Sequence, residues 1–265
     1  MTERARRDGA AQAAELRLVA LPGMPLVQRG DDIGGLIVEA LGRIAERLCD
    51  GDVLVVAQKI VSKAEGRLVR LANVQPSKRA LALAKETGKD PRIVQLVLAE
   101  SDEVVRCAPG VIIVGHRSGF VMANAGIDQS NVEPCDGDAV LLLPSDPDAS
   151  CATLRAQLRA RAGVDVGVII NDSHGRAWRN GTVGVALGAA GVPALLDLRG
   201  RPDLFERALR VTEVGLADEL ASAASILMGQ ADEGRPVVLV RGLPHARREG
   251  CARELARPRE RDLFR

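Results

Sequence analysis

Two unbroken apolar runs, each followed directly by a cluster of polar residues, constrain the fold of this chain most strongly. They are residues 53–57 and 166–170. Runs of about four to eight apolar residues without polar alternation are typical of buried strands. We therefore predict two buried strands. Because rigid strands often present functional groups at their ends, the polar clusters that follow these strands are candidates for chemistry.

Further periodicities predict a mixed set of elements. Strands are predicted at 16–21, 111–114, 120–124, 139–143 and 236–241, and helices at 33–48, 77–87, 91–101, 147–161 and 202–227. The stretch 182–192 is rich in glycine and apolar residues, which is compatible with close packing of the backbone. Strands and helices do not alternate strictly, and several strand pairs have the spacing of hairpins. The prediction is an α+β fold with mixed, largely antiparallel sheets and flanking helices, rather than a doubly wound sheet.

The domain organisation follows from length and composition. The chain has 265 residues, 46% of them apolar, which is enough for one large core or two small ones. Residues 1–14 are charged and rich in alanine, so we expect a flexible N-terminal extension. Residues 15–244 form the predicted folded unit, with two interwoven lobes as an alternative because no linker divides it. Residues 245–265 are expected to be a charged C-terminal tail.

Charge and composition argue against several classes of partner. The formal net charge is +1 and aromatic residues make up 2% of the chain, so neither a nucleic acid nor a membrane is an expected partner. No apolar stretch is long enough to span a bilayer, and the N-terminus lacks the apolar segment of a signal peptide. The cysteines are scattered without the short spacing of a metal or redox site, which predicts reduced thiols and a cytoplasmic protein.

Two polar clusters could bind phosphate and metal. The first, residues 58–67, combines two lysines, an arginine, a serine and a glycine where a predicted strand meets a loop. Such groups can contact phosphate oxygens, although a solvated basic turn is the simpler interpretation. The second, residues 123–131, places a carboxylate among amide and hydroxyl side chains. This set suits a hard cation such as Mg²⁺ or Mn²⁺, and an Asx-type turn is the simpler alternative.

Two further clusters follow predicted elements. Residues 171–181, interpreted as a loop at a strand end, contain a carboxylate, a hydroxyl, an imidazole, two guanidiniums and the only tryptophan. A structural turn rarely contains so many functional groups, although His174 alone is better explained as a hydrogen-bonding neighbour than as a catalyst. Residues 228–235 are explained as the end of a helix and a polar turn, or as a nucleotide-binding loop with Gln230 as a metal ligand. The common phosphate-loop, dinucleotide, hydrolase and zinc-protease motifs do not occur.

Taken in this order, the clusters resemble the coenzyme F420-0:L-glutamate ligase family. The resemblance extends from about residue 21 to residue 243. It depends on the strings GMPLVQRGDD (23–32), GDVLVVAQKIVSKAEGR (51–67), ANAGIDQSN (123–131), INDSHGRAWRNG (170–181) and MGQADEGRP (228–236). The third and fourth strings are the most specific.

The resemblance implies an α+β fold specific to this family, a homodimer, and a reaction that adds L-glutamate in γ linkage to coenzyme F420-0. GTP would be the co-substrate and two divalent ions, Mg²⁺ or Mn²⁺, the cofactors, with K⁺ as a further candidate. By motif position, the nucleotide-binding residues would be Gly23, Met24, Pro25, Leu26, Gln58, Lys59, Lys63, Asn131, Met228, Gly229, Gln230, Ala231, Asp232, Glu233, Gly234 and Arg235. The metal ligands would be Asp128, Asp172, Ser173 and Gln230.

The chain departs from the family pattern at two places. Gln58 and Lys59 stand where Ser-Thr is common in archaeal members, and Gln230 stands where glutamate can occur. These differences affect nucleotide affinity and metal preference.

The implied chemistry needs no nucleophile from the protein. A carboxylate becomes reactive towards an amine once phosphoryl transfer has made it an acyl phosphate, so the protein has to position the substrates and neutralise charge. Lys63, Arg176 and Arg179 are the predicted catalytic residues, and Glu65 and His174 are candidate bases. Three alternatives stay open: a ligase for another carboxylate acceptor, a metal-dependent phosphohydrolase, and a nucleotide-binding regulatory module without turnover.

Overall fold

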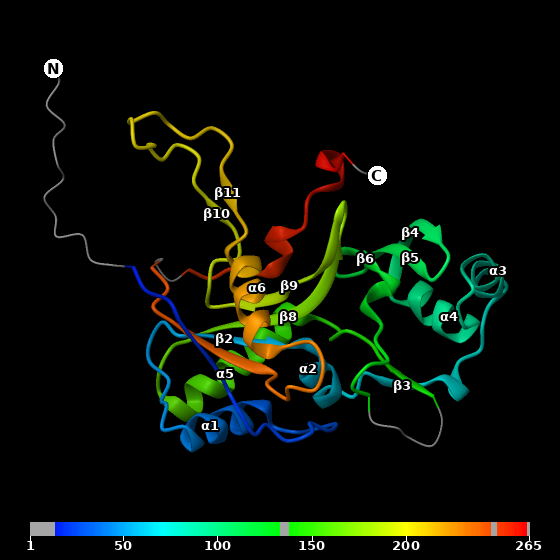
Figure 1. The fold of residues 1–265 in the computed structure, drawn as a ribbon, viewed down its shortest axis with the longest axis horizontal. Coiled ribbons are helices and arrows are strands. Elements are labelled where there is room, and N and C mark those ends of the chain that lie inside the picture. Colours follow the sequence, from blue (N-terminus) through cyan, green and yellow to red (C-terminus); the bar gives the residue numbers. More distant parts are fainter. Residues whose placement is uncertain (1–13, 133–137, 245–247, 264–265) are drawn as a thin grey trace, which may run out of the picture.

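A five-stranded sheet forms the centre of the molecule in a computed structural model (Figure 1), which describes residues 14–132, 138–244 and 248–263. The strand order is β1-β12-β2-β8-β9. Only β2 and β8 run parallel, and the other neighbours in this sheet are antiparallel. The strands are β1 (Arg17–Ala20), β12 (Val237–Arg241), β2 (Val53–Ala57), β8 (Gly167–Arg176) and β9 (Arg179–Ala190). The predicted α+β class with largely antiparallel sheets is confirmed.

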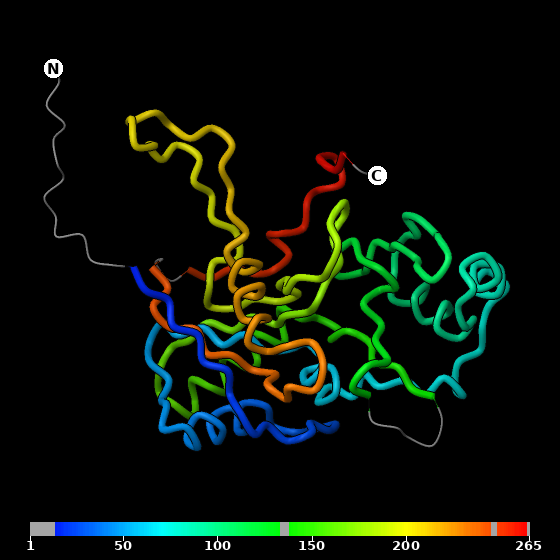
Figure 2. The backbone as a smooth tube through the Cα atoms, in the orientation of Figure 1, coloured from blue at the N-terminus to red at the C-terminus, as the bar shows by residue number. Residues whose placement is uncertain are grey.

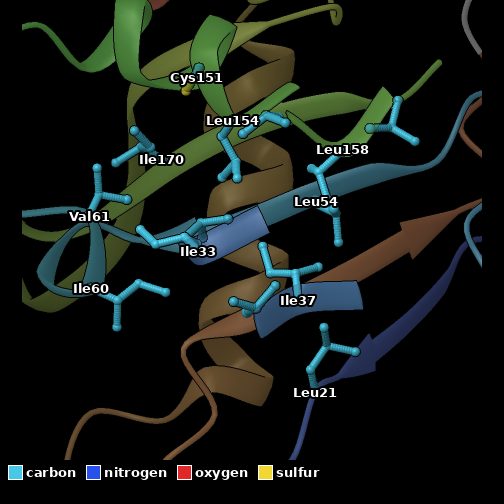
Figure 3. Close-up of a cluster of buried hydrophobic side chains, with 14 of the residues drawn as sticks. Leu21, Ile33, Ile37, Leu54, Ile60, Val61, Cys151, Leu154, Leu158 and Ile170 are labelled. Carbon is cyan, nitrogen blue, oxygen red and sulfur yellow. The ribbon is translucent and has the colours of Figure 1, made fainter. Parts of the chain in front are cut away.

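Helices cover both faces of this sheet, which explains the unbroken apolar runs. Leu54 and Ile170 belong to a core shared with α1 (Ile33–Arg43) and α5 (Pro147–Ala162), part of which Figure 3 shows. Val55 and Ile169 point to the opposite face and pack with α6 (Leu216–Met228). Because successive side chains of a strand alternate between faces, a strand covered on both sides needs apolar residues at every position.

A second group of elements lies beside the central sheet and packs around its own core. It contains two helices and an antiparallel three-stranded sheet in the order β4-β5-β6. Its elements are α3 (Lys78–Thr87), α4 (Pro91–Ala99), β4 (Ser101–Ala108), β5 (Val111–His116) and β6 (Val121–Ala123). In the sequence these elements fall between β3 (Leu68–Arg70) and β7 (Ala139–Leu141), which pair with each other. Short 3₁₀ helices complete the described chain: η1 (Leu71–Asn73), η2 (Asn124–Gly126), η3 (Ala252–Leu255) and η4 (Arg259–Arg261).

The expected helix over 202–227 is wrong in its first half. The helix α6 begins only at Leu216, and the preceding chain forms a hairpin of β10 (Leu196–Asp197) and β11 (Glu213–Val214). The long loop between these strands extends away from the body as an arm (Figure 2). Its apolar residues stay exposed because no described surface covers them, and Asp203 accepts backbone hydrogen bonds from Phe205 and Arg207 that favour a turn. The helix predicted over 91–101 ends at Ala99. The chain continues as strand β4, from Ser101 to Ala108, which the sequence analysis did not predict.

Two polar clusters adopt regular structure where loops were expected. Residues 58–64 form a helix, α2 (Gln58–Ala64), that begins immediately after β2. Residues 171–176 continue strand β8, and the chain returns along β9 after a two-residue turn. The two strands of this hairpin pair along its length, and side chains of α6 bond to the backbone of β9: Ser222 Oγ donates to the carbonyl oxygen of Gly184, and Asp218 Oδ1 accepts from the Ala186 amide. Within the described residues, no helix is long and apolar enough to cross a membrane.

The glycine-rich stretch 182–192 packs closely, as predicted. An added Cβ at Gly184 would lie 2.4 Å from the carbonyl oxygen of Ala221 in α6. An added Cβ at Gly188 would lie 2.3 Å from the carbonyl oxygen of Pro147 in α5. The pairing of β9 with β8 shifts register between Ile170 and Asn171. This shift turns β9, so that Gly184 faces α6 on one side of the sheet and Gly188 faces α5 on the other. The small residues of β9 therefore fix the distance of both helix layers from the sheet.

Candidate functional site

A cavity of about 820 Å³ opens at one edge of the central sheet. Its walls come from residues 24–29, helix α2, the middle of β8 and the loop after α6. Most of the predicted site residues line it: Met24, Pro25, Leu26, Gln58, Lys59, Lys63, Asn131, Asp172, Ser173 and Met228, Gly229, Gln230, Ala231, Asp232, Glu233, Gly234, Arg235. Four predicted residues are absent from its walls: Gly23, Asp128, Arg176 and Arg179.

The parallel pairing of β2 with β8 brings the two main motifs together. Ala57 lies opposite Asn171, so helix α2 and the polar part of β8 start from the same edge of the sheet. Gln58 is the first residue of that helix and is buried, and its Oε1 accepts a hydrogen bond from Ser62 Oγ at 2.9 Å. This internal bond orients the amide at the cavity wall. The carboxyl ends of parallel strands are a common place for ligand sites in mixed folds.

Lys63 joins α2 to the segment around Asn131, which in turn bonds to the loop after α6. Its Nζ donates a hydrogen bond to the carbonyl oxygen of Asn131 at 2.8 Å. Asn131 has a left-handed backbone with φ of 55°, and its Nδ2 donates to the carbonyl oxygen of Ala231 at 3.2 Å. In the same loop Glu233 Oε2 accepts from the Ala231 amide at 2.8 Å, and this backbone bond lowers the pKa of the Glu233 carboxyl. The cavity walls are therefore ordered by bonds between them.

Asp128 lies behind Lys59 rather than in the cavity wall. Its Oδ2 is 2.7 Å from Lys59 Nζ, and its Oδ1 accepts from the Ser130 amide at 2.7 Å. Lys59 Nζ also donates to Ser130 Oγ at 2.6 Å. Burial alone would raise the pKa of Asp128, but Lys59 and Ser130 outweigh it and hold that pKa below its ordinary value. Asp128 is therefore a carboxylate that already holds one cation.

The other three predicted metal ligands line the cavity, two on β8 and one on the loop after α6. Ser173 Oγ donates to Gln230 Oε1 at 2.7 Å, which joins β8 to the loop after α6. Asp172 Oδ2 is 3.1 Å from His174 Nε2. Neighbouring carboxylate, hydroxyl and amide oxygens are the donors that Mg²⁺ and Mn²⁺ accept, often with substrate phosphates completing the coordination shell. Within the described part of the chain, no group of three or more His, Cys, Asp or Glu side chains could hold a metal alone.

Several residues that line the cavity were missed by the sequence analysis, and two of them make close contacts with neighbouring segments. Asn171 is buried between β8 and α6, where its Nδ2 donates to Ser225 Oγ at 3.1 Å and to Met228 Sδ at 3.4 Å. Arg29 lines the cavity and passes so close to Gly66 that an added Cβ there would lie 2.8 Å from its Nε. Both residues lie inside the motif strings, so their position in those strings could have identified them as site residues.

The remaining candidates lie outside the cavity walls. Arg176 and Arg179 face each other at the exposed end of the β8–β9 hairpin. Gly23 lies next to the cavity, and its carbonyl oxygen accepts from Arg43 Nη1 at 2.5 Å. Glu65, one of the two candidate bases, accepts a hydrogen bond from Ser150 Oγ and does not line the cavity. His174, through its contact with Asp172, is the candidate base that lies beside the site.

Comparisons with known proteins agree with these motifs. The model of the F420-0:Gamma-glutamyl ligase family matches residues 23–242. The protein named Coenzyme F420:L-glutamate ligase from Methanothermobacter thermautotrophicus is 49% identical over 252 residues, which cover 94% of this chain and 99% of that protein. The protein of the same name from Methanopyrus kandleri is 50% identical over 254 residues, covering 94% and 98%. That from Archaeoglobus fulgidus is 46% identical over 243 residues, covering 92% and 94%.

Proposed function

The chain belongs to the F420-0:gamma-glutamyl ligase family, and on this premise we propose that it joins L-glutamate to the carboxylate of coenzyme F420-0 at the expense of GTP. The observation that carries the proposal is the cavity, around which three distant segments of the chain are bonded to one another. Its volume is in the range of ligand sites, and its walls combine apolar side chains with a few charged groups. Such a cavity can take a nucleotide.

The reaction proposed has two balanced steps. A carboxylate oxygen of F420-0 attacks the γ-phosphorus of GTP, so that an acyl phosphate forms and GDP leaves. The amine nitrogen of glutamate then attacks the acyl carbon, so that the amide forms, inorganic phosphate leaves and the amine loses a proton. Of the two candidate bases, neither of which lines the cavity, His174 is the one we propose to accept that proton, because it contacts Asp172, which does line the cavity.

The protein's contribution is to position the substrates and balance negative charge. Lys63 lines the cavity, and its ammonium can neutralise phosphoryl oxygens while it holds Asn131. Asp172, Ser173 and Gln230 would hold a divalent ion, Mg²⁺ or Mn²⁺, and the donor chemistry fits such an ion. Asp128 would contribute to a second ion only after releasing Lys59. When bound, the ions supply charge neutralisation at the phosphates.

We also propose that the protein is a homodimer in solution. The arm between β10 and β11 exposes Leu204 and Phe205, which are 98% and 73% accessible. Exposed apolar groups of this size are a common mark of subunit interfaces. Analytical ultracentrifugation measures the mass directly, and a monomer at micromolar concentration would contradict the proposal.

The test of function is mass spectrometry of F420-0 after incubation with the protein, L-glutamate, GTP and Mn²⁺. The expected product is heavier by one or more glutamyl units, and it requires both GTP and the metal ion. GTP hydrolysis without any change in the mass of F420-0 would instead favour another acceptor or a phosphohydrolase.

The site is tested by Asp172→Ala, with Asp102→Ala as the matched control. Asp172 lines the cavity, whereas Asp102 is an exposed carboxylate on β4. We expect the first variant to lose turnover by on the order of a hundredfold or more while its unfolding temperature stays close to that of the parent. The control variant should keep full activity. Equal activity of both variants would show that the assignment of Asp172 is wrong.

A further inference from the structure

The carboxylate of Asp128 already binds a cation that belongs to the chain, the ammonium of Lys59. Lys59 Nζ lies 2.7 Å from Asp128 Oδ2 and donates a hydrogen bond to Ser130 Oγ at 2.6 Å. The side chains of Lys59 and Asp128 are only 26% and 32% exposed. Solvent and salt screen a partly buried pair less than a pair on the open surface, so this contact is a stable feature of the site.

The backbone holds both partners of this ion pair in place. The amide and the carbonyl oxygen of Asp128 bond to the backbone of Leu141 in β7. Asp128 Oδ1 accepts a hydrogen bond from the Ser130 amide at 2.7 Å, which is the Asx-type turn considered as the simpler alternative for this cluster. Lys59 is the second residue of α2, the helix that starts at the edge of the central sheet. Both oxygens of the carboxylate therefore have a partner within the chain.

Lys59, rather than Asp128, is the member of the pair that lines the cavity. A ligand in the cavity therefore meets the ammonium before it meets the carboxylate behind it. An ammonium has three N–H donors, and Asp128 and Ser130 accept from two of them, so one donor is left for a ligand. A hydrogen bond from a charged donor to a phosphate oxygen is among the stronger polar contacts in proteins.

A divalent ion on Asp128 would compete with Lys59 for the same carboxylate. Mg²⁺ lies about 2.1 Å from its oxygen ligands. If it bound Asp128 Oδ2 while Lys59 stayed in place, it could lie no more than about 5 Å from Lys59 Nζ, where two cations repel each other. The residues around Asp128 therefore do not fit a second divalent ion. Asp172, by contrast, lines the cavity, and within the described chain it forms no ion pair with a lysine or an arginine.

We propose that the Lys59 ammonium takes the place of a second divalent ion, so that the site uses one divalent ion beside Asp172 together with Lys59. The inference rests on the proposed function, in which the cavity takes a nucleotide and a divalent ion. Lys59 then offers a fixed positive charge to the phosphate oxygens, and Asp128 and Ser130 are positioning residues for that charge. The family resemblance implies two divalent ions, and the lysine at position 59 reduces this number to one.

The experiment counts the Mn²⁺ ions bound per chain from the electron paramagnetic resonance signal of the unbound ion. Titrations are made without nucleotide and with GDP, after subtraction of a titration of GDP without protein. The variant Lys59→Met removes the charge at nearly constant length, and Lys59→Arg keeps the charge. The control is Lys85→Met, because Lys85 is an exposed lysine on α3 outside the cavity wall. We expect Lys59→Met to bind one ion more than the parent, and the other two variants to bind the same number as the parent.

Substitution of Asp128 identifies where the additional ion binds. The double variant Lys59→Met/Asp128→Asn should lose the additional ion, because the carboxylate that would hold it is gone. Asp128→Asn alone should bind as many ions as the parent, since Asp128 holds Lys59 rather than Mn²⁺. This single variant leaves Lys59 in place, so it tests the inference independently of how well Lys59→Met folds.

Two results would overturn the assignment of Lys59. One is an equal number of Mn²⁺ ions in the parent and in folded Lys59→Met. The other is the loss of an ion in Asp128→Asn, which would show that Asp128 is already a metal ligand in the parent. The reaction is tested separately: if the parent adds no glutamate to F420-0 and Lys59→Met still gains an ion that depends on Asp128, the proposed reaction fails and the assignment of Lys59 stands.

Discussion

Gly184→Ala is expected to destabilise the protein and to disturb the site through helix α6. An added Cβ would lie 2.3 Å from Ser225 Oγ, 2.4 Å from the carbonyl oxygen of Ala221 and 2.6 Å from Asn171 Oδ1. Ordinary contact begins at 3.4 Å, so these atoms would have to retreat by about 1 Å. The serine side chain can rotate, but the carbonyl belongs to the backbone of α6. The helix or the strand must therefore move.

The magnitude follows from the cost of overpacking a core, which is about 1–3 kcal/mol. Because a backbone atom is among the clashing groups, we expect the upper part of this range, about 2–3 kcal/mol. In a protein of this size, 1 kcal/mol lowers the unfolding temperature by about 2–4 °C, so the expected loss is roughly 5–10 °C. Asn171 bonds to Ser225 and Met228, so the same shift should displace the loop after α6 and raise KM for GTP.

The assay is thermal unfolding followed by circular dichroism, with Gly175→Ala as the matched control. Gly175 lies on the same hairpin, and an added Cβ there would meet no atom within 4 Å. We expect the control to be neutral or slightly stabilised, since alanine restricts the unfolded chain more than glycine does. The double variant Gly184→Ala/Ser225→Gly should remain destabilised because the Ala221 carbonyl stays in place. Equal unfolding temperatures for the two single alanine variants would refute the packing argument.

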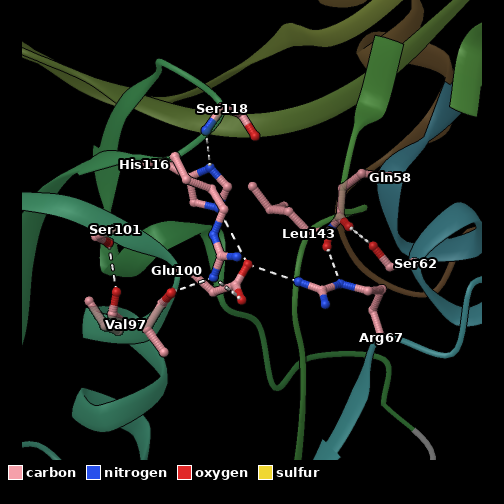
Figure 4. Close-up of polar contacts among 11 residues, drawn as sticks. Gln58, Ser62, Arg67, Val97, Glu100, Ser101, His116, Ser118 and Leu143 are labelled. Atoms are coloured by element: carbon pink, nitrogen blue, oxygen red, sulfur yellow. Dashed lines mark hydrogen bonds and ion pairs between the residues drawn. The ribbon is translucent and has the colours of Figure 1, made fainter. Parts of the chain in front are cut away.

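Two further predictions concern buried ionisable groups. Burial would raise the pKa of Glu100, but His116, Arg67 and Arg117 outweigh it and keep this pKa below the ordinary glutamate value (Figure 4). Glu100 therefore stabilises the fold fully above pH of about 4.3 and loses this effect as the pH falls through its lower folded pKa. Arg67 and Arg117 each donate a hydrogen bond to Glu100 at 2.8 Å. We therefore expect Glu100→Gln to lower the free energy of unfolding, measured in urea, by about 2–4 kcal/mol at pH 7 and by less at pH 3. A cost that does not change with pH would contradict this. Burial raises the pKa of the Cys151 thiol well above its usual range, so iodoacetamide at pH 8 should leave it unmodified until urea unfolds the protein, as peptide mass mapping can show.

Much of the local structure could be predicted because it depends on nearby residues. The unbroken runs 53–57 and 166–170 are strands because only apolar side chains can be buried on both faces of a sheet. The segments around Pro91 and Pro147 begin helices because proline fits the first turn, where its missing amide donor is not needed. The glycines of β9 indicate close backbone packing from the sequence alone, although the sequence does not show that α5 and α6 are the helices that pack there.

Local patterns failed where distant contacts decide the structure. Helical spacing of apolar residues in 202–215 suggested a helix, but without a surface to cover them they lie on an extended arm. The cluster 171–181 has the composition of a loop and forms a hairpin, since pairing with β9 and contact with α6 satisfy its backbone and side chains. Composition alone could not distinguish these cases.

The sequence by itself determined the two buried strands, the motif strings and the chemical groups that follow them. Only the tertiary structure decided that these groups meet. The parallel pairing of β2 with β8 places Gln58 and Asp172 at one edge of the sheet, and the bond from Asn131 to Ala231 joins two segments of the cavity wall. Residue periodicity reports which face of an element is buried, but not which other element covers it. That choice depends on packing between segments far apart in the chain, which only the folded molecule contains.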